Sequence, residues 1–126
     1  MSVIRTFTVT VANPGAGNRY YIDGVLQETV NLAEGYTYKF DVSDSSVSGH
    51  PFKFSTTNNG THSGGSEYTT GVTTSGNAGD NGAYVQIVVA ASAPQLYYYC
   101  QYHSGMGGQA NTVDSDTWGV LKWNEN

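Results

Sequence analysis

The chain has a single cysteine among its 126 residues, Cys100, so no disulfide can form within it. Basic residues are also scarce, since five lysines and arginines stand against ten acidic residues and the net charge is −5. The five are scattered along the sequence, and no stripe of positive charge is available to bind phosphates. We therefore expect no nucleic-acid partner.

The N-terminal residues lack the long apolar run of a signal peptide or a membrane span. Met1 leads almost directly into residues 3–11, where apolar and polar side chains alternate as in a strand. We therefore expect that these residues encode neither export nor membrane insertion.

Composition predicts one β-rich domain spanning residues 1–126. A chain of this length suits a single core that buries roughly two-thirds of the surface exposed when unfolded. Charged residues make up only 12%, whereas Gly occurs 16 times and Tyr ten times, a mixture that favours strands joined by turns over helices.

Strand-like alternation recurs along the chain, with turn residues between the segments. The segments lie at residues 4–11, 19–22, 28–32, 36–42, 50–54, 68–72, 83–90, 96–100 and 118–123. We expect seven or eight short strands among these nine segments, and their number without helical periodicity predicts an all-β, antiparallel Greek-key β-sandwich. On the strand 96–100, Leu96, Tyr98 and Cys100 share one face, so Tyr99 is expected outside the core.

Three potential metal ligands, Cys100, His103 and Met106, follow one another at intervals of three residues directly after a predicted strand. A four-residue turn brings its ends within about 7 Å, so Cys100 and His103 can both reach one ion. Met106 can approach the ion from one side, and His50, at the boundary between a turn and a strand, offers a fourth ligand. Two His and one Cys with a weak axial Met form a copper electron-transfer geometry.

The scarcity of these residue types strengthens the copper interpretation. A lone Cys is usually a small buried hydrophobe, and a lone loop His is usually solvated. This chain has one Cys, three His and one internal Met, and three of those five residues fall within seven positions. The remaining imidazole, His62, lies in a Thr-Ser-Gly-rich stretch and is expected to be a mobile loop residue.

With its single upstream His and an aromatic strand ending in Cys, the Cys-x2-His-x2-Met pattern resembles the cupredoxin (blue copper) family. The ligand loop has a length like that of amicyanin, and its second gap is two residues shorter than in plastocyanin. The resemblance implies one copper ion with His50, Cys100 and His103 as equatorial ligands and Met106 as axial ligand. It also implies that Tyr99 lies on a through-bond route to the metal.

The local sequences around His50, Cys100 and His103 also look like cupredoxin-like modules in structural proteins of marine phages. This similarity fits the lack of a signal peptide, from which we expect a host cytoplasm or a virion if the sequence is native, and the periplasm only if a leader has been removed. It leaves two functions open, a redox carrier and a virion part.

Pro51 departs from the family pattern. In typical cupredoxins the residue after the first His donates its backbone N–H to the Cys sulfur, and Pro has no N–H to donate. A sulfur with one donor fewer is more electron-rich and favours Cu(II). We therefore expect a reduction potential at the low end for the family.

The leading functional hypothesis is one-electron transfer by a monomeric protein that is not an enzyme. A small redox protein or reductase would dock at the His103 loop, where Pro51, Gly105, Met106 and Gly107 would form a small apolar patch.

Three other functions are open at this level. In the first, the protein is a structural or adhesion module of a phage virion whose metal staples the ligand loops to the core. In the second, the metal is zinc, although Met106 argues against it because zinc gains little from a thioether. A Cys-His hydrolase is the weakest, since the sequence singles out neither an orienting third residue nor an oxyanion hole.

Overall fold

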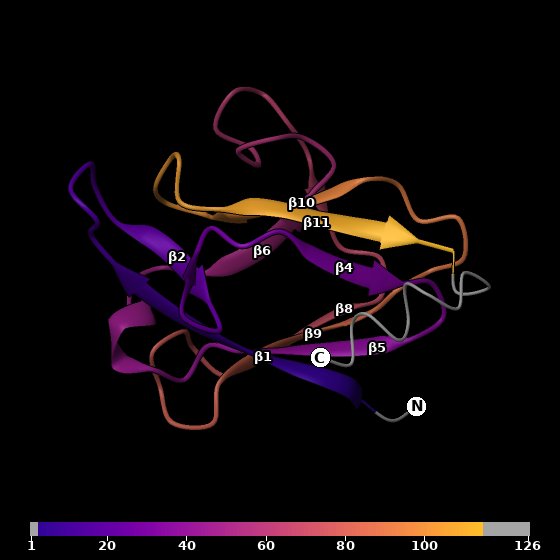
Figure 1. The fold of residues 1–126 in the computed structure, drawn as a ribbon, viewed down its shortest axis with the longest axis horizontal. Coiled ribbons are helices and arrows are strands. Elements are labelled where there is room, and N and C mark those ends of the chain that lie inside the picture. The colour runs from indigo at the N-terminus through magenta and orange to yellow at the C-terminus, as the bar shows by residue number, and fades with distance from the viewer. Residues whose placement is uncertain (1–2, 115–126) are drawn as a thin grey trace.

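The computed structural model describes residues 3–114 and shows two β-sheets that lie one above the other (Figure 1). One sheet has the strand order β3-β2-β1-β5-β9-β8 and the other β4-β11-β10-β6-β7. The elements are β1 (Val3–Ala12), β2 (Arg19–Ile22), β3 (Val25–Leu26), β4 (Val30–Ala33), β5 (Thr37–Asp41), the 3-10 turn η1 (Ser45–Val47), β6 (Phe52–Ser55), β7 (Glu67–Tyr68), β8 (Val72–Ser75), β9 (Tyr84–Val88), β10 (Leu96–Cys100) and β11 (Gly108–Val113). No helix in this part of the chain is long and apolar enough to cross a membrane.

The predicted all-β sandwich is confirmed, and its sheets are mixed rather than purely antiparallel. β1 pairs in parallel with β5, because the chain crosses to the other sheet through β4 before it returns. β11 likewise pairs in parallel with β4. The described residues form eleven strands, more than the seven or eight expected, because two-residue strands such as β3 and β7 are too short to show alternation.

The strand β11 lies between β10 and β4 and was not predicted from the sequence. Its residues Gly108, Ala110 and Asn111 are of types depleted in strands, and only the small Ala110 is fully buried. The closing strand predicted at residues 118–123 lies outside the described residues.

A stack of aromatic rings joins the two sheets through the core. Phe7 stacks on Phe40 at 4.8 Å between ring centroids, Phe40 on Phe52 at 5.0 Å, and Phe52 on Tyr98 at 5.2 Å. Each such pair contributes about 0.5–1.5 kcal/mol beyond the burial of its apolar area. The stack thereby fixes β6 and β10 against the first sheet; β6 begins two residues after His50, and β10 ends at Cys100.

The connection between β6 and β7, residues 56–66, projects from the second sheet beside β10 (Figure 1) and covers Tyr99. Tyr99 lies outside the core cluster, as its place on the strand predicts, but it is only 2% exposed and is not a surface residue. Gly60 permits this, because its φ of +61° is left-handed and any Cβ there would overlap the Tyr99 ring.

We predict that Gly60→Ala destabilises the fold far more than Gly64→Ala in the same segment. Both glycines have left-handed φ values, +61° and +83°, but a Cβ at Gly64 would meet open space. Backbone strain costs each variant about 1–2 kcal/mol, and overlap with Tyr99 adds about 1–3 kcal/mol at Gly60 alone. Chemical denaturation of both proteins measures the difference, and equal losses would contradict the packing of residues 56–66 on Tyr99.

Candidate metal centre

His50 is presented by a tight turn at the entry to β6. The Asp44 side chain accepts a hydrogen bond from the Ser46 N–H and begins η1, and the His50 N–H donates to the Val47 carbonyl at 2.9 Å as the turn closes. His50 is 9% exposed and heads a buried row with Phe52 and Phe54.

Cys100 ends β10 directly beside β6. Antiparallel pairing sets Cys100 opposite Phe52, and the Gln101 N–H donates to the Pro51 carbonyl at 3.1 Å. Cys100 is fully buried on the same face as Leu96 and Tyr98, as the alternation predicts. The pairing therefore brings together two segments that lie 50 residues apart.

Three donor atoms meet at this point, the Cys100 sulfur and one nitrogen each of His50 and His103, all within 4.8 Å of one another. The sulfur lies 3.6 Å from His50 Nδ1 and 3.5 Å from His103 Nδ1. A sulfur and a nitrogen that bind one ion at about 2.3 and 2.0 Å lie about 3.5–3.7 Å apart in tetrahedral or trigonal arrangements. The observed distances fit a metal held by all three side chains.

The two imidazoles differ in exposure, and both face the sulfur. His50 is buried, His103 is exposed, and their ring centroids lie 4.7 Å apart. Burial lowers the pKa of His50, and the nearby charge of His103 lowers it further. At neutral pH His50 is therefore in the neutral form that metal binding requires.

Met106 lies in the core at the end of the ligand loop and is 1% exposed. The prediction that it contributes to a surface patch is wrong, because the loop turns inward after Gly105. Tyr102 is the large apolar side chain that the loop does present to solvent, and it is 65% exposed. The axial role of Met106 stays a prediction.

Side chains from two distant segments hold the ligand loop in place. Asn59 donates to the Ser104 hydroxyl and accepts from the Gly105 N–H, both at 2.8 Å. Gln27 donates to the carbonyls of Gly105 at 3.0 Å and Gly107 at 2.7 Å. The sequence predicted neither contact. The dipeptide Asn59-Gly60 indicates a turn, but it does not indicate that this turn contacts the ligand loop. No feature of the sequence indicates a contact for Gln27.

His62 lies outside the three-ligand group, as expected, but it is not a loosely solvated loop residue. Its Nε2 is 2.7 Å from the Cys100 carbonyl oxygen, and because a carbonyl can only accept, Nε2 carries the proton. The half-buried imidazole also meets the Tyr99 ring edge-on, with 6.1 Å between centroids. His62 therefore anchors the backbone of the candidate ligand Cys100.

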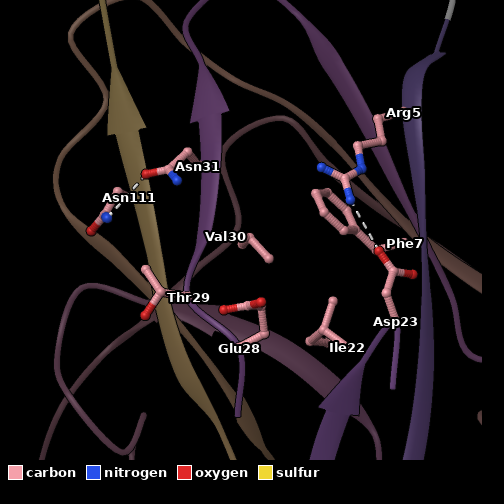
Figure 2. A pocket seen from close by; sticks show the side chains of 9 residues that line it. All are labelled: Arg5, Phe7, Ile22, Asp23, Glu28, Thr29, Val30, Asn31 and Asn111. Carbon is pink, nitrogen blue, oxygen red and sulfur yellow. Dashed lines mark hydrogen bonds and ion pairs between the residues drawn. The ribbon is translucent and has the colours of Figure 1, made fainter. Parts of the chain in front are cut away.

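A separate hollow of about 380 Å³ opens between β1 and β2 on one side and β4 and β11 on the other (Figure 2). Within it the Arg5 guanidinium pairs with Asp23 at 3.1 Å and lies 4.3 Å from the Phe7 ring centroid. The lining residues are Arg5, Phe7, Ile22, Asp23, Glu28, Thr29, Val30, Asn31 and Asn111. None is a Cys or His, so the hollow supplies no ligand to the candidate metal centre.

No protein-family model and no curated protein matches the sequence. Solved structures do match. The chain is similar to rusticyanin from Thiobacillus ferrooxidans, with 15% sequence identity and a TM-score of 0.53 over 89% of this chain and 79% of rusticyanin. A second structure, described as the copper protein rusticyanin, matches at 15% identity with a TM-score of 0.54 over 89% of this chain and 80% of the other.

The chain is also similar to part of the McoA multicopper oxidase from the hyperthermophile Aquifex aeolicus. The identity is 14% and the TM-score 0.52, over 94% of this chain and 28% of the oxidase. At identities this low the structural match shows a shared fold and nothing more, and it confirms the predicted cupredoxin-like sandwich. The chain has the cupredoxin fold.

Proposed function

We propose that this protein binds one copper ion through His50, Cys100 and His103, with Met106 as a weaker axial ligand, and carries single electrons between redox partners. The observation that supports it most directly is the convergence of two imidazoles and a thiol at separations of 3.5 and 3.6 Å. The fold shared with rusticyanin, described as a copper protein, adds support.

Copper in such a site supplies a Cu(II)/Cu(I) couple. The protein's own residues would supply the environment. Cys100 offers a soft sulfur that is shielded from water, and His50 offers a buried imidazole in its neutral form. His103, the exposed member of the set, would connect the site to the surface.

The neighbourhood of His103 suits brief docking of a small redox protein or reductase. His103 and Tyr102 are both exposed, and Tyr102 adds an apolar surface beside the imidazole. Weak electron-transfer encounters commonly bury less than about 1,200 Å², so a small patch suffices.

The hydrogen bonds of the ligand loop favour a carrier over a virion module stapled by metal. A staple is needed where loops lack other attachments, whereas Asn59 and Gln27 already fix residues 104–107 to the protein. A loop held in this way would keep its shape in both oxidation states, as rapid electron exchange requires.

We expect titration of the purified protein with Cu(II) to produce an intense thiolate-to-copper charge-transfer band that saturates at one equivalent. The same titration of Cys100→Ser should give no such band, because the sulfur is the electron donor of the transition. Visible absorption and electron paramagnetic resonance measure both. Without a band in the unaltered protein, copper electron transfer is refuted, and zinc or no metal takes its place.

We further expect the metal-free protein to keep its fold and to unfold cooperatively, with reversible redox cycling after copper is added. Thermal unfolding of both forms and cyclic voltammetry of the copper form measure these properties. A metal-free protein that melts at a far lower temperature than the copper form, together with slow or irreversible redox behaviour, would favour a structural module held together by its metal.

Met106→Leu tests the axial ligand. The variant should still bind one copper and keep the charge-transfer band, because the three strong ligands remain. Its reduction potential should rise, because the thioether that is lost donates electron density that favours Cu(II). The reverse exchange at another fully buried position, Leu96→Met, conserves volume in the same way and serves as the packing control. An unchanged potential in Met106→Leu would remove Met106 from the proposed ligand set.

A further inference from the structure

One turn in the connection between β6 and β7 contacts the ligand loop at two places. The turn closes where the His62 N–H donates to the Asn59 carbonyl at 3.3 Å. The Asn59 side chain binds Ser104 and Gly105, and the bond to each is 2.8 Å long. The His62 imidazole binds the Cys100 carbonyl, at the start of the loop, at 2.7 Å. This turn therefore holds the stretch from Cys100 to Gly105 at both of its ends.

The Cys100 carbonyl lies beyond the end of the pairing between β10 and β11. The Gln101 N–H donates to the Pro51 carbonyl on the β6 side, so the alternation of an antiparallel ladder turns the Cys100 carbonyl to the other side of the strand, where β11 lies. The pairing with β11 ends at Tyr98, two residues before Cys100. Cys100 is fully buried, and a buried carbonyl without a donor is costly. His62 therefore supplies the hydrogen bond that a sheet partner would otherwise make.

The backbone of this turn brings His62 close to β10. Asn59 and Gly60 are consecutive residues with left-handed φ values of +65° and +61°, which Asn and Gly tolerate better than other residues. Gly60 lies against the Tyr99 ring, and the His62 ring meets the same ring edge-on. The Thr57 hydroxyl donates to the Gly60 carbonyl at 2.8 Å. The position of the His62 imidazole is therefore fixed by packing and by backbone geometry as well as by its own hydrogen bond.

We propose that His62 is a positioning residue of the metal centre, which orients the Cys100 sulfur by holding the Cys100 carbonyl. This inference rests on the proposed copper function. The carbonyl carbon and Cβ are bonded to the same Cα, so a carbonyl that cannot rotate limits the directions in which Cβ places the sulfur. The imidazole N–H also offsets the negative end of the carbonyl dipole near the sulfur, which favours the electron-rich, reduced state of the site.

His62→Leu in the copper-loaded protein tests the proposal, with His62→Gln as the rescue. Leucine is of similar size and donates no hydrogen bond, whereas the side-chain amide of glutamine offers an N–H at about the reach of Nε2. His62→Leu should lower the reduction potential and change the copper hyperfine splitting in electron paramagnetic resonance, and His62→Gln should restore most of both. Values in His62→Leu that match the unaltered protein, or changes that His62→Gln does not reduce, would overturn the proposal.

Gln95→Leu is the matched control at the opposite end of the same strand. The Gln95 side-chain amide donates to the Leu96 carbonyl at 2.9 Å, so it also holds a carbonyl of β10. Leu96 begins the strand that Cys100 ends, and the control should leave the reduction potential and the copper spectrum unchanged. Changes as large as those of His62→Leu would show that any loosening of β10 has this effect, and they would overturn the proposal.

Amide hydrogen exchange of the unaltered protein gives a second test, which does not depend on the folding of a variant. Because coupling between two sites is reciprocal, a metal bound by Cys100 should stabilise the turn that holds Cys100. The Gly60 and His62 amides donate within this turn, and the Ala93 amide donates within a turn before the start of β10. When the metal-free protein takes up Cu(I), exchange at Gly60 and His62 should slow about two- to tenfold, the range expected for one hydrogen bond, while exchange at Ala93 keeps its rate.

Unchanged exchange at Gly60 and His62 in protein that holds copper would overturn the proposal. Absence of any charge-transfer band in the unaltered protein with Cu(II) would instead refute the proposed copper function itself, so the two failures are distinguishable.

Discussion

The pairing of β6 with β10 is the constraint on which the candidate metal centre depends. It sets Phe52 opposite Cys100, and His50 precedes Phe52 by two residues, so the pairing alone brings the imidazole to the sulfur. The stack of Phe40, Phe52 and Tyr98 locks this pair of strands against the other sheet. A slip of the register by one residue would turn Cys100 away from the core and separate its sulfur from the two imidazoles.

The ligand loop is ordered by side chains rather than by regular secondary structure. Tyr20, Gln27 and Asn59 each bind its backbone, and they come from three different segments of the chain. His62 binds the Cys100 carbonyl, next to the start of the loop. The contacts around the donor atoms therefore depend on the whole fold, as the positions of the donor atoms do.

Local pattern in the sequence predicted the donor atoms but not the contacts that surround them. Alternation placed Cys100 on a buried face, and its spacing from His103 predicted that both donors would meet. Gln27, in contrast, is an ordinary polar residue in the sequence, and only the fold brings its amide to the ligand loop. Tyr99 alternates outward as expected, yet residues 56–66 return across it and remove it from the surface. Alternation reports which face of a strand a side chain occupies, but not what later covers that face.

The separation of the candidate ligands along the chain has a consequence for biosynthesis. Cys100 and His103 are three residues apart and can capture a soft metal ion even in an unfolded chain, whereas His50 joins them only after strands 50 residues apart have paired. Pairings of such long range form slowly. An ion that binds the short pair early would stabilise the unfolded chain and oppose folding. Such an ion would favour the folded state only once the pairing of β6 with β10 had added His50 to the set.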